Sequence, residues 1–433
     1  MVKYKKIFYA FQNKEAEMAE LKIRLDIPDV NILKSEYNRT NDLILTVEST
    51  KKSTFCRNCG KKINKVHGYG ETILLRHLSI LDQPVYIRIK PVRYICLTCD
   101  DNPTTTEQPD WYGRKSKFTK AYEEYLMRLL INSTILDVAK KEGLTFDDVE
   151  GALNRQVEQE VDWERFDKLK LLGIDEIALK KGHKDFVAVV STRINNETKI
   201  IAILPDRKKN TVKSFLESMP ERLKLTVKML CTDMYDGYIN AFKEVFGSRV
   251  KVVVDRFHIA KKYRECADKL RKKELARLKA ELSTDEYKKL KGAMWALRKK
   301  SKNLNEDEII ILENLFNYSP ALKEAYELQN KLTEIFNTNY NKQQGEKEIK
   351  KWMKKVERSE LTCFDNFLLT LRNYWNEILN YFHRKGRKNS GFVEGLNNKI
   401  KTLKRRCYGI FSTKSLYQRI RLDLDGYNIF ARC

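Results

Sequence analysis

The stretch at 169–179, LKLLGIDEIAL, decides how the central part of the chain folds. It is an apolar run of strand length, interrupted by the acidic pair Asp175 and Glu176. Apolar stretches at 186–192 and 199–204 follow after short turns, a pattern that predicts three antiparallel strands. A carboxylate inside a buried strand is costly unless its charge is used. The stretch therefore predicts a β-sheet with a functional carboxylate, Asp175.

Beyond this stretch, helical and strand-like segments alternate. We expect a helix, a buried strand, a second helix and a short strand at 211–219, 227–232, 237–246 and 250–254. The resulting order, β-β-β-α-β-α-β, is that of an RNase H-like core. In such a sheet the first and fourth strands are neighbours, so Asp175 converges with Asp233, which ends the fourth strand. Carboxylates suit hard divalent cations, and two Mg²⁺ or Mn²⁺ ions can activate a nucleophile and stabilise a leaving oxygen.

A third carboxylate is expected from a helix in this architecture, and Glu394 lies in the first turns of the helix expected within the stretch 389–401. Amide and basic side chains follow it, which suits a site that holds both metal and phosphate. The candidate DNA contacts there are Asn398, Lys401, Lys404, Arg405 and Arg406. We therefore expect Asp175, Asp233 and Glu394 to be catalytic and to hold the two metal ions. Each of these acids, taken alone, fits a surface or salt-bridged residue as well.

Residues just after the last strand compete for roles near this site. Asp255 fits either a substitute metal ligand or a residue that supports the ligands. Arg256 is a candidate DNA contact. His258 fits a contact with DNA or the active site, and it fits an ordinary packed or capping histidine equally well.

Two cysteine pairs stand in the N-terminal part, Cys56 with Cys59 and Cys96 with Cys99. A CxxC turn brings two thiolates onto one knuckle, and two such knuckles complete a tetrahedral zinc site. The long segment between the pairs has room for a β-hairpin, which the alternating pattern at 80–89 predicts. Four thiolates leave no open coordination position, so the predicted Zn²⁺ is structural. The alternative is four unliganded cysteines in strands.

The segment 133–149 has the pattern of a helix-turn-helix. A Ser-Thr pair at 133–134 supplies a cap, Gly143 permits the turn, and Thr145 caps a second helix near 146–155. That second helix would enter a DNA major groove. The candidate DNA contacts are Lys140, Lys141, Thr145 and Arg155. An ordinary helical hairpin is the alternative interpretation.

The charge of the chain points to a polyanionic partner. The 433 residues include 84 Lys and Arg against 59 Asp and Glu, a formal net charge of +25. A solvated, lysine-rich surface is the alternative explanation. No apolar run reaches the roughly 18 residues that a membrane span needs. Nine cysteines, an odd number with paired spacing, favour metal binding in a reducing compartment, so we expect a cytoplasmic, nucleoid-associated protein.

At these residues the chain resembles the ISL-three family of bacterial insertion-sequence transposases, over nearly its whole length. The resemblance rests on the cysteine pairs, the helix-turn-helix and four motifs. These motifs are GIDE at 173–176, TDM at 232–234, DRFH at 255–258 and EGLNNKIK at 394–401. The resemblance implies a DDE transposase that binds the terminal inverted repeats of its element and catalyses metal-dependent DNA cleavage and strand transfer. It implies the same triad and a helical insertion after the fifth strand.

The combined patterns predict five segments. They are a β-rich zinc-binding domain, an all-α helix-turn-helix domain, a first core part, a helical insertion and the C-terminal core helices, at 1–112, 113–165, 166–255, 256–388 and 389–433. A helix is also expected near 16–23. The partner is double-stranded DNA, both element ends and target. We expect a homodimer on DNA, because two ends must be held together.

Two other functions fit the same motifs. A domesticated relative would keep the DNA-binding modules and regulate transcription without cleavage. A junction-resolving or RNase H-type nuclease would cleave without strand transfer, but it would not need so large a sequence-reading N-terminal part. Terminal inverted repeats beside the gene would distinguish a transposase from both.

Overall fold

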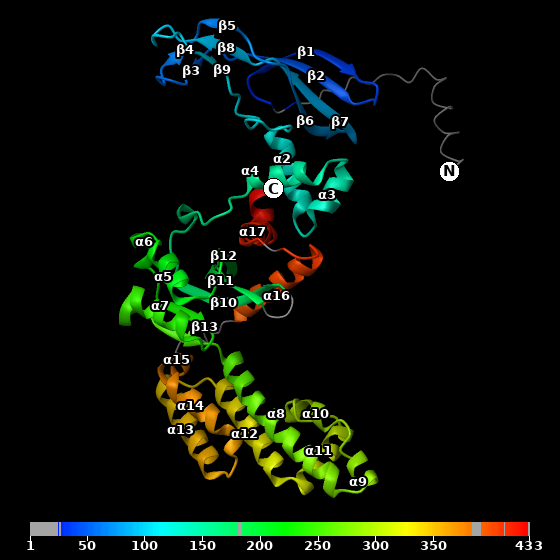
Figure 1. Cartoon of the computed structure of the whole chain (residues 1–433), viewed down its shortest axis with the longest axis vertical. Helices are drawn as coiled ribbons and strands as arrows, with labels where there is room; N and C mark the ends of the chain where they lie inside the picture. Colours follow the sequence, from blue (N-terminus) through cyan, green and yellow to red (C-terminus); the bar gives the residue numbers. More distant parts are fainter. Residues whose placement is uncertain (1–24, 26, 181–183, 383–390, 411, 432–433) are drawn as a thin grey trace, which may run out of the picture. The chain divides into compact units, whose positions relative to one another are not determined.

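The structure, a computed structural model, is a mixed α/β protein that divides into two units, Met1–Leu126 and Met127–Cys433 (Figure 1). It describes residues 25, 27–180, 184–382, 391–410 and 412–431. The helix expected near 16–23 lies outside the described residues.

The first unit is built mainly on a four-stranded sheet with the order β1-β2-β7-β6. Its strands are β1 (Val30–Tyr37), β2 (Leu43–Ser49), β6 (Ile73–Ile80) and β7 (Gln83–Ile89). Alternate residues of β7 point into the core, where Val85, Ile87 and Ile89 are fully buried. The predicted hairpin at 80–89 is confirmed, with Leu81 and Asp82 both at positive φ in the turn.

Two small sheets in the first unit carry the cysteine pairs. The strands are β3 (Thr54–Phe55) with β4 (Lys62–Ile63), and β5 (Val66–Tyr69) with β8 (Val92–Ile95) and β9 (Thr104–Thr106). Cys56 directly follows β3, and Cys96 directly follows β8. The ends of these two strands therefore bring the cysteine pairs into one cluster.

The second unit begins within α2 (Lys120–Leu130), which is followed by α3 (Ile135–Glu142) and α4 (Phe146–Gln156). The predicted caps are confirmed. The Thr134 hydroxyl caps α3, and Thr145 forms a capping box with Asp148 at the start of α4. Gly143 ends α3 in the left-handed conformation, at φ 64°, that the turn between the two helices requires.

A five-stranded sheet forms the centre of the second unit, with the order β12-β11-β10-β13-β14. Its strands are β10 (Leu171–Lys180), β11 (Lys184–Ile194), β12 (Glu197–Leu204), β13 (Met229–Thr232) and β14 (Lys251–Val254). The first three are antiparallel, and β10, β13 and β14 are parallel. Asn195 and Asn196 join β11 to β12 at positive φ, as a tight hairpin turn requires.

Helices cover both faces of this sheet (Figure 1). On one face, Ile174 and Val190 pack with α5 (Lys209–Glu217), α6 (Glu221–Lys224) and α7 (Asp236–Phe246). On the other, Ile177 and Val189 pack with α16 (Gly391–Arg406) and α17 (Thr413–Phe430). Successive residues of a strand face opposite sides, so the apolar residues of β10 are shared between two cores.

The segment after β14 is helical, as expected. Its elements are α8 (Arg256–Glu281), α9 (Thr284–Lys288), α10 (Ala293–Ala296), α11 (Glu306–Tyr318), α12 (Pro320–Asn337), α13 (Lys342–Arg358), α14 (Asp365–Asn373) and α15 (Trp375–Leu379). Short 3-10 turns lie at Trp163–Arg165, Gly247–Arg249, Ser301–Asn303 and Thr362–Phe364. In the centre of this segment the Tyr263 ring stacks on the Phe364 ring, with their centroids 4.7 Å apart, and it contacts the Trp352 ring edge-on. Among the described residues, no helix combines the length and apolar character needed to cross a bilayer.

Candidate functional site

The register of the central sheet places Asp175 beside Asp233. Strands β10 and β13 are parallel, and Gly173 pairs with Cys231. Each acid lies two residues beyond that pair, on the same face of the sheet. Neighbouring strands are about 4.8 Å apart, so the two carboxylates share one small region at the ends of these strands.

Helix α16 approaches the same face of the sheet at Gly173. A Cβ atom on Gly173 would lie 2.5 Å from Val393 Cγ2 and 2.9 Å from Phe392 Cζ, so only glycine leaves room for the helix here. One turn further on, Asn397 Nδ2 donates a hydrogen bond of 2.6 Å to Asp175 Oδ2. The contact fixes the orientation of the Asp175 carboxylate from the helix that carries Glu394.

The close approach at Gly173 gives a stability prediction. Gly173→Ala should lower the free energy of unfolding by about 1–3 kcal/mol, because the added methyl overpacks the contact with α16. Gly395→Ala is the matched control, because a Cβ there meets nothing within 4 Å. The control should raise stability by about 0.5–1 kcal/mol through the better helix propensity of alanine. Urea unfolding measures both, and equal effects at the two sites would refute the steric argument.

The environment of the two aspartates penalises negative charge. Burial is the main cause that raises the pKa of Asp175, although the backbone N–H of Glu176 and the charge of His258 act in the opposite direction. Burial, followed by the negative charge of Asp175, raises the pKa of Asp233 to about 6. Two half-buried carboxylates that disfavour each other's ionisation form a site that a cation would stabilise.

The third predicted acid, Glu394, lies on α16 one helical turn before Asn397. Its side chain is exposed and makes no hydrogen bond or ion pair with another described residue. Asp175, Asp233 and Glu394 do not form a set of ligand atoms within 4.8 Å of one another in the described part of the chain. The structure thus brings Asp175 and Asp233 together. Glu394 lies on α16, the helix that contacts Asp175 through Asn397.

Other charged residues around the aspartates have separate partners. Glu176 accepts a hydrogen bond of 2.7 Å from Arg207 Nη1, and the Arg207 guanidinium lies 5.3 Å from the Tyr235 ring centroid. Asp255 caps α8 by accepting from the Phe257 N–H at 3.0 Å. Sequence reasoning did not find Arg207, which no motif marks. Asn397 had a usable signal, since its spacing from Glu394 places both on one face of a helix.

The predicted DNA-contacting residues of α16 divide into two groups. Asn398, Lys401 and Arg405 are exposed and lie on the same side of the helix as Glu394. Lys404 instead donates to the carbonyls of Ala178 and Leu179, and Arg406 pairs with Asp423 at 2.5 Å. These last two side chains hold α16 against the protein.

The remaining predicted contacts lie on helices α3, α4 and α8. Lys140, Lys141 and Arg155 are exposed, whereas the Thr145 hydroxyl is used in its capping box. Arg256 donates from Nη1 to the Phe336 carbonyl, Asn337 and the Tyr381 hydroxyl. His258 is half-buried, and its charge acts on both aspartates.

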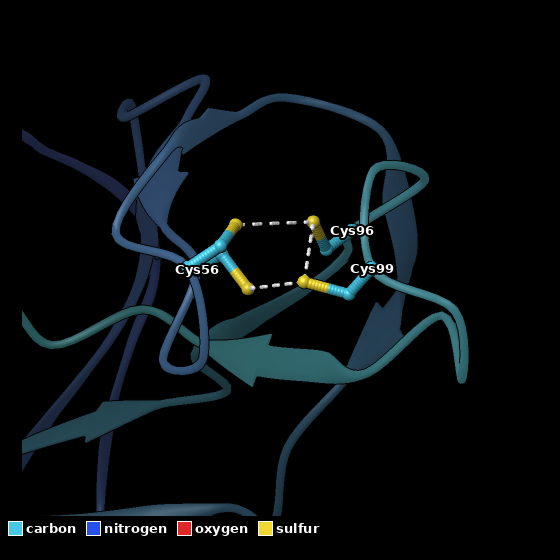
Figure 2. A group of neighbouring side chains, drawn as sticks. Cys56, Cys96 and Cys99 are labelled. Atoms are coloured by element: carbon cyan, nitrogen blue, oxygen red, sulfur yellow. Dashed lines mark hydrogen bonds between the residues drawn. The ribbon is translucent and has the colours of Figure 1, made fainter.

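The four N-terminal cysteines form a cluster that could hold a metal ion. Their sulfur atoms all lie within 4.8 Å of one another. The Sγ–Sγ distances are 3.9 Å for Cys56 and Cys99, 3.8 Å for Cys59 and Cys96, and 3.7 Å for Cys96 and Cys99. Figure 2 shows the sulfurs of Cys56, Cys96 and Cys99 turned toward one another. The sulfurs lie at the spacing of tetrahedral thiolate ligands.

The thiols in this cluster also favour a cation. The backbone N–H of Thr98 is the main cause that lowers the pKa of Cys96 to about 6. Contact with the other thiols, Cys59 first, raises the pKa of Cys99 to about 12. The cluster therefore ionises readily once and resists further ionisation until a positive charge compensates the thiolates.

Comparison with known proteins defines the class as a DNA transposase. A family model described as a transposase, of the DDE type and the ISL3 group, matches residues 172–420, more than half of the chain. The chain therefore belongs to the ISL3 family of DDE transposases, enzymes that act on DNA and use divalent metal ions.

Two kinds of curated relative cover most of the chain. It is similar to the transposase for insertion sequence element IS1001 of Bordetella parapertussis, with 27% identity over 89% of this chain and 92% of that protein. It is also similar to the transposase for IS1557 of Mycobacterium tuberculosis, strains CDC 1551 and H37Rv, with 22% identity over 87% of each chain.

Proposed function

We propose that this transposase binds the terminal inverted repeats of its own insertion sequence, and that it cleaves and joins DNA strands at Asp175, Asp233 and Glu394. The observation that carries the proposal is the adjacent pair Asp175 and Asp233, whose shared environment calls for a cation. The strand order, three antiparallel strands followed by two parallel ones, supports an RNase H-like core.

The two aspartates and Glu394 would hold two Mg²⁺ or Mn²⁺ ions. When bound, such ions activate the attacking hydroxyl and stabilise the leaving oxygen. Asn397 keeps one Asp175 oxygen oriented, and the partial burial of both aspartates limits the water that would screen their attraction for a cation. Glu394 has no competing partner among the described residues, so its carboxylate is available to this site.

We propose that α3 and α4 form a helix-turn-helix that reads the DNA ends. Their short connection, their caps and the burial of Ala139 on α3 support it. The first turn of α4 carries Asp147 and Asp148, so phosphate contacts are better served by Lys140, Lys141 and Arg155. In α16 we assign DNA contact to the exposed Asn398, Lys401 and Arg405.

A basic hollow of about 210 Å³ in the helical segment supports a further DNA contact. It lies between α8, the segment after α10, and α12, and no carboxylate lines it. Its five cations are Arg256, Arg264, Arg298, Lys299 and Lys300. Only two of these cations pair with acids among the described residues, Arg298 with Asp268 and Lys299 with Glu308. Such a lining suits a DNA phosphate.

For the N-terminal cluster we propose one structural Zn²⁺, held by all four cysteines. We also propose that the protein acts as a homodimer on DNA, because a transposition reaction joins two ends at once. The sulfur–sulfur spacing supports the zinc site, and the need to join two DNA ends supports the homodimer.

The test of the function uses purified protein and DNA that carries the gene's own flanking repeats. With Mg²⁺, we expect strand cleavage at the repeat tips, and without added divalent metal we expect binding without cleavage. DNA with scrambled repeats is the control. Tight repeat binding without cleavage in Mg²⁺ or Mn²⁺ would instead support a DNA-binding regulator.

The raised pKa of Asp233 predicts a pH-dependent metal response. Its value of about 6 lies above the ordinary 3.8, so the folded state binds this proton more tightly than the unfolded state. Stability from this group is therefore present below about pH 4 and is lost as the pH rises through 6. Divalent metal should restore it, so Mg²⁺ should raise the thermal unfolding midpoint more at pH 7.5 than at pH 5.

Asp233→Asn gives the matching measurement by scanning fluorimetry. Without metal, the variant should be more stable than wild type at pH 7.5, and Mg²⁺ should no longer shift its midpoint. Asp307→Asn, which removes an exposed carboxylate on α11, should respond to Mg²⁺ as wild type does. An unchanged metal response in the Asp233 variant would contradict the metal role.

A further inference from the structure

Helix α17 buries an unusual number of polar and charged side chains. Its buried residues include Gln418, Arg419, Arg421, Asp423 and Asp425. A helix that only packs on a core would bury apolar residues on that face. Buried charges are tolerated when each is paired. The partners of Asp423 lie on two elements with different proposed roles, the turn before α3 and helix α16.

The two carboxylate oxygens of Asp423 bind different elements. Oδ1 accepts a hydrogen bond of 3.0 Å from the backbone N–H of Asn132, in the turn between α2 and α3. Oδ2 accepts one of 2.5 Å from Arg406 Nη2, at the last residue of α16. Asp423 thus joins the start of the proposed DNA-reading helix pair to the end of the helix that carries Glu394.

Neighbouring contacts strengthen this junction. Arg419 lies one helical turn before Asp423. Its Nη2 donates to the carbonyls of Leu130 and Ser133, at 3.1 and 2.6 Å, in the same connection between α2 and α3 that contains Asn132. On the other side, Lys399 Nζ of α16 donates to the Asp423 carbonyl at 2.6 Å. A movement of either element would leave a charge of this buried set without its partner, so the two elements tend to move together.

We propose that Asp423 is a positioning residue that couples DNA binding by α3 and α4 to the placement of α16 and its Glu394. The inference rests on the proposed function of these helices. When α3 and α4 bind a DNA end, the turn at Asn132 becomes less mobile. Because Asp423 binds both Asn132 and Arg406, the position of Arg406 is restricted as well. Glu394 lies twelve residues, about 18 Å, along the same helix, so a small rotation at the Arg406 end is carried to the catalytic side.

Asp425 provides a matched control on the same helix. It is as buried as Asp423, 4% against 5% exposed, and its carboxylate binds two cations, whereas that of Asp423 binds one cation and one backbone N–H. Its partners are Lys199 on β12 at 2.7 Å and Arg165 at 3.1 Å, neither of which belongs to α16 or to the turn before α3. Asn substitutions at both positions remove one buried charge, but only the Asp423 variant breaks the junction.

The experiment compares wild type, Asp423→Asn and Asp425→Asn on DNA carrying the terminal repeats. All three should bind the repeats with similar affinity. Single-turnover cleavage of bound DNA should fall about ten-fold or more in Asp423→Asn alone, within the usual range of coupling between sites. Hydrogen exchange adds a readout that does not need cleavage. DNA should increase protection of the amides at 391–406 in wild type and Asp425→Asn, and not in Asp423→Asn.

Equal cleavage losses in both variants, or unchanged protection of α16 in DNA-bound wild type, would overturn the coupling. If Asp423→Asn does not fold, Arg406→Lys tests the same junction from its other partner, with the charge retained. Failure of wild type to bind the repeats would overturn the proposed function, and this inference with it. Repeat binding that leaves α16 unaffected would overturn the inference alone.

Discussion

Glu394→Gln should lower the rate of strand cleavage by roughly 10³-fold or more, while the affinity for the terminal repeats stays unchanged. Glutamine keeps the size of the side chain but removes the charge that a metal ligand in this site needs. Because Glu394 is exposed and has no partner among the described residues, the substitution should leave folding unaffected. The measurement pairs a gel assay of cleavage in Mg²⁺ with a binding titration.

The control for this variant is Glu327→Gln, the same change at an exposed position of α12. It should cleave as wild type does. A parallel loss of repeat binding in Glu394→Gln would assign Glu394 to DNA contact instead of catalysis. Residual cleavage within ten-fold of wild type would remove it from the proposed triad.

Zinc removal should unfold the first unit. Structural zinc contributes on the order of 10–16 kcal/mol in small zinc-binding peptides, as much as the whole stability of a typical domain. Cys96→Ser should have the same effect, because Cys96 is fully buried within the cluster and serine is a poor replacement for a thiolate ligand. Limited proteolysis should then digest residues of the first unit, and sequence-specific binding should be lost.

Cys266→Ser is the control, because Cys266 is half-buried in α8 and lies outside the four-cysteine group. It should retain zinc, measured by release to a colorimetric chelator, and should keep the first unit resistant to protease. A zinc-free protein that resists digestion and still binds the repeats would refute a structural role for the metal.

Several features of the fold could be predicted because local sequence records them directly. The alternation at 80–89 predicted a hairpin, and the Thr134, Gly143 and Thr145 positions predicted two capped helices; all of these are confirmed. Caps, turns and strand alternation depend on residues a few positions apart, so a single chain carries the whole signal. The cysteine cluster was also predictable, since its ligand spacing is fixed by the two CxxC knuckles.

Other features depend on residues brought together from distant parts of the chain. The spacing of Asn397 from Glu394 places it near the candidate site, but the sequence does not indicate that its amide binds Asp175, 222 positions away. Lys404 and Arg406 look like surface cations in a basic run, yet both turn inward to partners on β10 and α17. The sequence shows that a side chain is charged, but the packing of the folded chain determines which partner it contacts.

The family, the cysteine cluster, the order of strands along the chain and the identity of the candidate acids can all be inferred from the sequence alone. These depend on residue chemistry and on periodicities of two or 3.6 residues, which are local properties. The tertiary structure decided that Gly173 admits α16, that Asp175 is oriented by Asn397, and that Asp423 joins two helical elements. Such contacts arise from the register of strands and the seating of helices, because close packing leaves room for only one arrangement of distant side chains.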